Sequence, residues 1–195
     1  MKTALASLLF LLTAKLAALA VVDLGTSAGF TPYDAYMRPV KQVLSNLSGD
    51  GADMDKVRSL MREGRGFRYS YTDPYNAALP SVTAATHAGD CKAKALWLCD
   101  RLNDQNVRFV VGKTSTRAKL SHAWVMWQHE GRWWILDCTN TSNPIAADRV
   151  PSSQYIPLYS WSKNGEYRHT STQMLLSADA TASHSVPVAS QAASR

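Results

Sequence analysis

The sequence predicts a single domain that combines helices with antiparallel β-hairpins. The chain has 195 residues, of which 46% are hydrophobic and 18% charged, enough apolar material for one compact core but little for two. Its first half carries apolar residues at the three- and four-residue spacing of amphipathic helices. Its second half carries short apolar runs separated by turn residues, which is typical of hairpins.

Two helices are expected in the N-terminal half. The first begins at Thr31-Pro32, because threonine is a good N-cap and proline fits the first helical position, and it ends before Ser48. The second begins near Met54 and stops by Gly64. Their apolar stripes, which we interpret as core faces, are Met37, Val40, Val43, Leu44 and Leu47, then Met54, Val57, Leu60 and Met61. Phe67–Tyr71 then alternates like a strand, and a loop leads on to Gly89.

A third helix is expected from Cys91 to about Asn103, with Asp90 as its N-cap. This places Cys91 among unpaired N–H groups at the positive end of the helix dipole. Such a position favours the thiolate, and the thiolate is the nucleophilic form of cysteine. Cys91 is therefore a candidate nucleophile, although a cysteine taken alone is more often a buried structural residue.

The register of one hairpin brings two further candidates together. The expected strands are Arg108–Gly112, Ser121–Trp127, Trp133–Cys138, Tyr155–Trp161 and Glu166–Thr170. If the turn centres on Glu130-Gly131, Trp124 faces Asp137, and His122 lies on the same face because side chains alternate along a strand. A slip of one residue would separate His122 from Asp137. If the Cys91 helix packs on that face, the three groups form a nucleophile, a general base and an orienting carboxylate.

Four segments in this order resemble the transglutaminase-like superfamily of papain-related cysteine enzymes. They are Gly89-Asp90-Cys91-Lys92-Ala93-Lys94-Ala95, Val107-Arg108-Phe109-Val110-Val111-Gly112, His122-Ala123-Trp124-Val125 and Trp134-Ile135-Leu136-Asp137-Cys138-Thr139. The resemblance covers about Phe67 to Thr139. It implies an α+β fold with a papain/transglutaminase-like core, in which the nucleophile helix packs on an antiparallel sheet. It also implies a Cys91, His122, Asp137 triad and acyl transfer through a thioester acyl-enzyme.

The sequence departs from the family at one position beside the expected triad. Cys138 stands where the family usually has proline after the aspartate, so the backbone conformation at this point does not follow from the resemblance. The backbone N–H of Cys91 is one candidate donor to an oxyanion, and Tyr69, Tyr71 and Thr86 are unranked candidates for the other.

Residues 1–20 resemble a signal peptide, since Lys2 precedes an apolar run and Ala18-Leu19-Ala20 offers small residues for cleavage. Lys15 interrupts that run, so an uncleaved membrane anchor is the alternative. We expect the domain to occupy 21–174 and the Ala- and Ser-rich tail at 175–195 to be disordered. A secreted or periplasmic location follows, with no stable membrane span once the signal is removed. Removal of the signal peptide would lower the net charge from +6 to about +4. Because the sequence has no dense run of basic residues, nucleic-acid binding is not expected.

Three cysteines fit one disulfide plus one free thiol in an oxidising compartment. We expect Cys99 and Cys138 to be bonded to each other, or at least buried, which spares Cys91. A zinc site is an alternative, with Cys91, Cys99, Cys138, His87 and His122 as its conceivable ligands. Because no two cysteines have the usual close spacing and no acidic loop suits calcium, neither a metal nor a cofactor is expected.

The sequence thus predicts an exported cysteine-dependent hydrolase or acyltransferase that acts on amide bonds of peptides or proteins, with peptidase favoured over transamidase. The rival from another class is a catalytically silent domain of the same fold that binds a peptide or glycan. Its binding surface would use the aromatic residues of the sheet, Trp124, Trp127, Trp133 and Trp134. The oligomeric state is left open.

Overall fold

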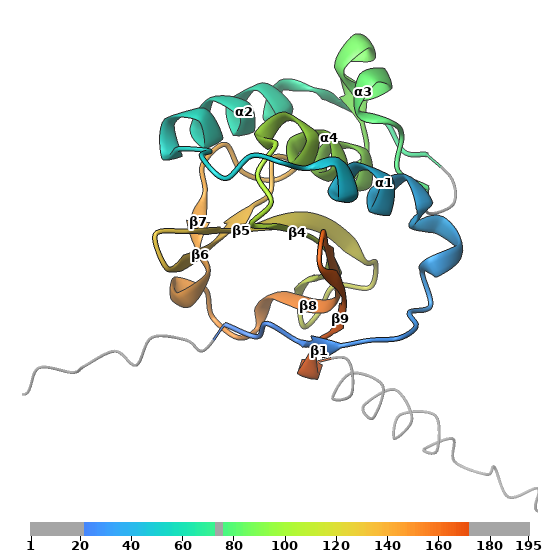
Figure 1. Cartoon of the computed structure of the whole chain (residues 1–195), viewed down its shortest axis with the longest axis vertical. Helices are drawn as coiled ribbons and strands as arrows, with labels where there is room; N and C mark the ends of the chain where they lie inside the picture. The colour runs from blue at the N-terminus through green and yellow to red at the C-terminus, as the bar shows by residue number, and fades with distance from the viewer. Residues whose placement is uncertain (1–21, 73–75, 172–195) are drawn as a thin grey trace, which may run out of the picture.

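Four helices cover one face of an antiparallel sheet in the computed structural model, which describes residues 22–72 and 76–171 (Figure 1). The helices are α1 (Arg38–Asn46), α2 (Met54–Gly66), α3 (Pro80–Thr86) and α4 (Cys91–Leu102), with short 3-10 helices η1 (Asp34–Tyr36) and η2 (Ala147–Arg149). The strands are β1 (Thr26–Ser27), β2 (Arg68–Tyr69), β3 (Ala88–Gly89), β4 (Val107–Ser115), β5 (His122–His129), β6 (Arg132–Leu136), β7 (Ile145–Ala146), β8 (Gln154–Ser162) and β9 (Gly165–Arg168).

Seven strands form the main sheet in the order β1-β9-β8-β4-β5-β6-β7, and every pairing in it is antiparallel. Strands β2 and β3 form a separate parallel pair. The predicted α+β class is confirmed: α1 to α4 precede strands β4 to β9 in the chain, and the helix that begins at Cys91 packs on the sheet.

The first helix begins later than expected. The sequence predicted a helix from Thr31, but the chain forms η1 and then α1, which begins at Arg38 with Pro39 in its first turn. A helix continuing from Thr31 would hold Pro39 in its interior, where proline lacks the needed N–H and clashes with the preceding turn. Thr31 still organises the segment, because its hydroxyl donates to the carboxylate of Asp34 at 2.7 Å.

Helix α2 passes through Gly64, where the sequence predicted its end, and stops at Gly66. A Cβ atom on Gly64 would lie 2.8 Å from a ring carbon of Trp97 and 2.9 Å from Sγ of Cys138. Glycine at this position therefore lets α2 approach α4 closely and does not end the helix.

The segment leading to α4 also differs from expectation. The strand predicted over Phe67–Tyr71 shortens to the two residues of β2, which pair with β3. The predicted loop contains α3, which begins at Pro80, a residue suited to the first turn of a helix. Its end is marked by His87 in the left-handed conformation, with φ of 46°.

The β5–β6 hairpin has the predicted register. Met126 pairs with Ile135, and Gln128 pairs with Trp133. Gly131 in the turn has φ of 73°, a conformation that glycine adopts readily.

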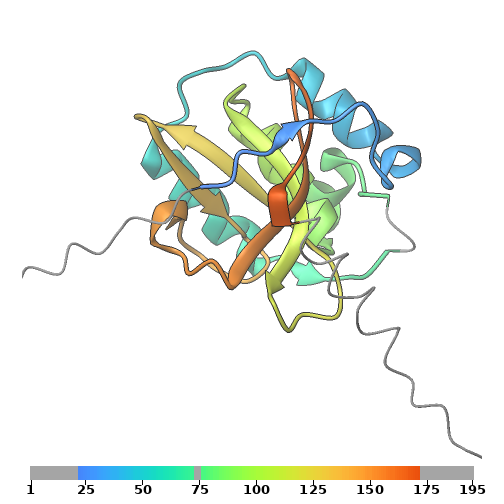
Figure 2. The same cartoon turned by 90° about the horizontal axis from the view of Figure 1, so that it is seen from below.

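The two faces of the sheet bury different clusters. The larger core lies between the sheet and the helices and includes Ala123, Val125 and Trp127 of β5. The smaller cluster, on the other face, contains Val110, Trp124, Met126 and Ile135, with Val22 and Tyr155 among the residues packed against it. Figure 2, seen from below, shows the N-terminal segment crossing in front of the strands, with the helices behind them.

Helix α4 therefore packs on the sheet, but on the Ala123 face of β5 and not on the face of His122 and Trp124 that the sequence indicated as the condition for the three groups to meet. Both faces of β5 are apolar, so the alternation of side chains could not indicate which one takes the helix. The expected signal segment and tail lie outside the described residues. Within the described ranges, none of the helices combines the length and apolar character needed to cross a membrane.

We predict that Gly64→Ala lowers the free energy of unfolding by at least about 1 kcal/mol, because the added methyl overpacks the contact with Trp97 and Cys138. The control is Gly66→Ala in the same helix, where a Cβ meets nothing within 4 Å. That change should be neutral or stabilise by up to about 1 kcal/mol. Urea unfolding measures both variants, and equal effects would contradict the packing role of Gly64.

Candidate active site

Asp90 fixes the start of α4. Its buried carboxylate accepts through Oδ1 from the N–H groups of Lys92 at 3.0 Å and Ala93 at 3.1 Å. Through Oδ2 it accepts from the backbone N–H and the hydroxyl of Thr72, so the cap also holds the segment after β2. Burial opposes ionisation, but these donors and the nearby ammonium of Lys92 lower the pKa of Asp90 below its usual value. Cys91 is thereby held as the first residue of α4.

His122 and Asp137 are in direct contact. His122 is the first residue of β5 and Asp137 follows the last residue of β6, and Nε2 of His122 lies 2.9 Å from Oδ2 of Asp137. The hairpin register places them together, as the sequence predicted. Burial opposes protonation of the imidazole, but the hydrogen bond with Asp137 and the interactions with Cys91 outweigh it and raise the pKa of His122 to about 9.

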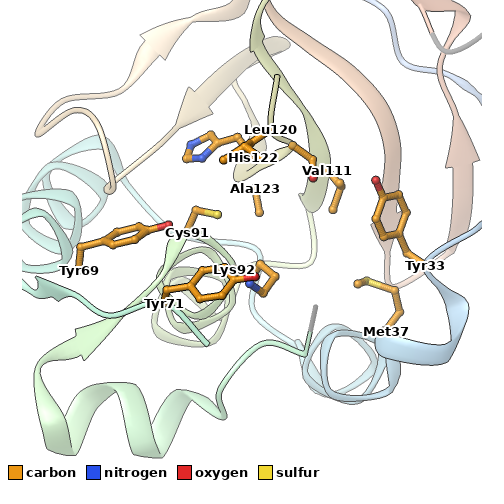
Figure 3. A pocket seen from close by; sticks show the side chains of 11 residues that line it. Tyr33, Met37, Tyr69, Tyr71, Cys91, Lys92, Val111, Leu120, His122 and Ala123 are labelled. Carbon is orange, nitrogen blue, oxygen red and sulfur yellow. The ribbon is translucent and has the colours of Figure 1, made fainter. Parts of the chain in front are cut away.

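The thiol and the imidazole meet at one end of the sheet. His122 is the first residue of β5 and Cys91 is the first residue of α4, and both side chains line the same cavity. In Figure 3 the imidazole and the sulfur of Cys91 border the same space. The structure thus brings Cys91, His122 and Asp137 together although most of α4 packs on the other face of β5.

Asp137 is 1% exposed, yet its carboxylate is surrounded by donors. Oδ2 accepts from the side-chain amide of Asn140 at 2.8 Å and from the hydroxyl of Tyr155 at 2.9 Å. Oδ1 accepts from the backbone N–H groups of Thr139 and Asn140. Burial favours the neutral acid, but His122 and the other donors lower the pKa of Asp137 below its usual value. The carboxylate is therefore charged at neutral pH and fixed in orientation.

Tyr155 is a residue of this site that the sequence did not indicate. It lies in β8 with φ of 45°, a left-handed conformation that costs a tyrosine about 1–3 kcal/mol. Its ring packs edge-on against Trp124, with centroids 5.5 Å apart. The β4–β8 pairing that brings it to Asp137 shifts register at Val111/Gly112. Such a long-range pairing leaves no local pattern around Tyr155.

Cys91 lines a cavity of about 260 Å³. Its lining consists of Tyr33, Met37, Tyr69, Tyr71, Cys91, Lys92, Val111, Leu120, Ser121, His122 and Ala123 (Figure 3). Among the three side chains considered as oxyanion donors, Tyr69 and Tyr71 lie in this cavity. Thr86 is not among the lining residues and donates its hydroxyl to the carbonyl of Val82 at 2.8 Å.

Of these side chains, Tyr69 is the best candidate for a hydrogen-bond donor to an oxyanion. Burial raises its pKa, and the neighbouring Cys91 and Asp90 raise it further, so its hydroxyl keeps its proton near the thiol. Its hydroxyl points toward Cys91 in Figure 3.

All three cysteines are free and buried. The expected Cys99–Cys138 disulfide is therefore not formed in this structure, whereas the alternative expectation, that both are buried, is confirmed. Burial raises the pKa of Cys138 to about 12 and shifts that of Cys99 upward as well. Within residues 22–72 and 76–171, no three His, Cys, Asp or Glu side chains gather as a metal site requires.

The aromatic surface that the rival binding function needs is not formed as expected. Trp124 and Trp127 are almost fully buried, one on each face of the sheet. Trp133 and Trp134 are only partly exposed. The exposed aromatic side chains at the site are instead Tyr69 and Tyr71, beside Cys91.

No protein-family model and no curated protein matches this sequence. Among solved structures, LapG of Legionella pneumophila is similar at 16% identity, covering 68% of this chain and 78% of that one, with a TM-score of 0.49. Its calcium-bound form gives 16% identity, 65% and 74% coverage and a TM-score of 0.48. A candidate cysteine protease of Cytophaga hutchinsonii gives 17% identity, 54% and 39% coverage and a TM-score of 0.39. Because both the sequence identity and the structural similarity are low, the function has to be inferred from the site itself.

The raised pKa of His122 predicts a pH-dependent stability. The imidazole stabilises the fold while it is charged, fully below its unfolded pKa of about 6.5, and this contribution is lost as pH rises through about 9. We expect the free energy of unfolding to fall by up to about 3 kcal/mol across this window.

Asp137→Asn is the control, since it removes the carboxylate partner of His122 and keeps the buried cysteines, which also titrate above about pH 8.5 when unfolded. The difference between the two pH profiles, measured by urea unfolding, isolates His122. If stability falls equally with pH in both proteins, a charged His122 does not contribute to the stability of the fold.

Proposed function

We propose that this chain is a cysteine-dependent amide hydrolase of the transglutaminase-like superfamily that cleaves peptides or proteins. The observation that supports it most is the convergence of three groups: a thiol at a helix N-terminus, an imidazole bordering the same cavity, and a carboxylate 2.9 Å from that imidazole. This arrangement suits nucleophilic catalysis with a general acid and base.

Each group has a defined role in the proposed reaction. The sulfur of Cys91 attacks the amide carbonyl and forms a C–S bond. His122, protonated at neutral pH because its pKa is about 9, donates its proton to the leaving nitrogen as the C–N bond breaks. Water then attacks the thioester carbonyl and His122 takes a proton from that water. The C–S bond breaks and the acid product leaves, which restores the free sulfur of Cys91 and the protonated imidazole of His122. Asp137 holds the imidazole so that Nδ1 faces the reacting atoms.

The oxyanion of the tetrahedral intermediate requires two donors. The backbone N–H of Cys91 lies in the first turn of α4, where helix N–H groups have no carbonyl within the helix to bind. We assign the second donor to the hydroxyl of Tyr69, on account of its position beside Cys91.

Hydrolysis is proposed ahead of transamidation, with water as the acceptor of the acyl group. Export to the periplasm or the exterior is part of the proposal and is supported by the signal-like composition of residues 1–20.

We predict that a small electrophile such as iodoacetamide labels Cys91 in the folded protein at pH 7 and leaves Cys99 and Cys138 unmodified. Cys91 lines the cavity, whereas the other two lie outside it and have raised pKa values. Peptide mapping by mass spectrometry identifies the adduct. His122→Ala should slow the labelling, and Cys91→Ala should abolish it. Labelling that persists at the parent rate in folded Cys91→Ala protein would remove Cys91 as the nucleophile.

Tyr69→Phe should lower kcat on a cleaved peptide by about 10²–10³, the loss typical of one oxyanion donor, with little change in KM. Iodoacetamide labelling of Cys91 should stay at the parent rate, since alkylation creates no oxyanion. The fold should tolerate the change because Tyr69 is 55% exposed. Tyr167→Phe, outside the cavity, serves as the control. An unchanged kcat in Tyr69→Phe would show that another group is the second oxyanion donor.

A further inference from the structure

We infer that the cavity beside Cys91 selects substrates by binding one uncharged, apolar side chain of leucine, methionine or phenylalanine size next to the scissile amide. This inference rests on the proposed function and names the substrate class of the same site.

The wall of the cavity facing the core is apolar. Met37, Val111 and Ala123 belong to the main core and are nearly inaccessible to water, so they form a fixed surface. They come from the start of α1 and from the paired strands β4 and β5, at Val111↔Ala123. A side chain reaching this wall leaves water for an apolar environment, which favours binding roughly in proportion to the area covered.

The rim of the cavity exposes apolar side chains to solvent. Tyr69 is 55% exposed, Tyr71 66% and Leu120 83%. Single exposed apolar residues are common, but these three surround one cavity that also contains the candidate nucleophile. Leu120 precedes β5, whereas the tyrosines follow α2, and Figure 3 shows Leu120 across the cavity from Tyr69 and Tyr71. A peptide could therefore cover both sides of the rim.

The lining offers no free charge to a charged side chain. It includes no carboxylate, and its two cationic groups are already paired with buried carboxylates. The ammonium of Lys92 lies 2.5 Å from Oδ2 of Asp90, and Nε2 of the protonated His122 lies 2.9 Å from Oδ2 of Asp137. A charged substrate side chain would lose hydration here without gaining a partner, and that loss is costly.

The size of the cavity fits one side chain. A cavity of about 150 Å³ holds a benzene molecule, whereas sites for drug-sized ligands run from about 300 Å³ upward. A cavity of about 260 Å³ therefore accommodates a leucyl, methionyl or phenyl group together with part of the backbone amide.

The test is digestion of a peptide mixture of near-random sequence, with the cleaved ends identified by mass spectrometry. At one position within two residues of the cleaved bond, we expect leucine, methionine and phenylalanine to exceed aspartate, glutamate, lysine and arginine by at least about tenfold. Leu120→Glu should lower kcat/KM for the best apolar peptide by about tenfold and relax the exclusion of lysine and arginine. Phe30→Glu is the matched control, since Phe30 is also exposed, at 68%, but lies outside the cavity.

Cleavage without an apolar preference, or an unchanged preference in Leu120→Glu, would overturn the assignment of the cavity and leave the proposed hydrolase intact. Failure of the parent protein to cleave any peptide, with Cys91 absent from the labelled residues, would overturn the hydrolase, and the inference would fall with it. An equal loss in Phe30→Glu would show a general effect of the added charge and would also overturn the assignment.

Discussion

The buried carboxylate of Asp137 is the interaction on which the site depends. It is reached from β5 by His122, from the turn after β6 by Asn140, and from β8 by Tyr155. A charge removed from water must be compensated by donors, so these segments cannot move apart without exposing an unpaired carboxylate. The same contacts that make the charge tolerable also orient the imidazole. Stability and alignment of the site therefore have a common origin.

The sheet separates the two halves of the site. Helix α4, with Cys91 at its start, packs on one face, whereas Asp137 and Trp124 belong to the other. His122 connects the two halves, since its ring lines the cavity with Cys91 and its Nε2 lies 2.9 Å from the carboxylate of Asp137. Asp90 supplies the corresponding anchor on the helix side, since its carboxylate binds both the first turn of α4 and Thr72. Both anchors are buried carboxylates held in place by donors.

Much of this arrangement could be predicted from local sequence. The Asp90 cap defined the start of α4, and the turn at Gly131 defined the register that pairs His122 with Asp137. Predictions of helix boundaries failed where the same residue type can serve more than one structural role. Glycine ends helices and also permits close packing, which is its use at Gly64. Tyr155 could not be predicted because it reaches the site through β4–β8 pairing, whose register depends on a bulge.

The N-terminal segment and the last hairpin supply parts of the cavity and of the carboxylate's surroundings, although both lie far in sequence from the candidate catalytic residues. Tyr33 and Met37 line the cavity, Tyr155 binds Asp137, and β1 pairs with β9. A fragment limited to Phe67–Thr139 would thus carry Cys91, His122 and Asp137 yet lack a cavity wall, a donor and the strand beside β4. Substitutions in those outer segments can therefore reshape the cavity or loosen the hold on Asp137 while Cys91, His122 and Asp137 themselves stay unchanged.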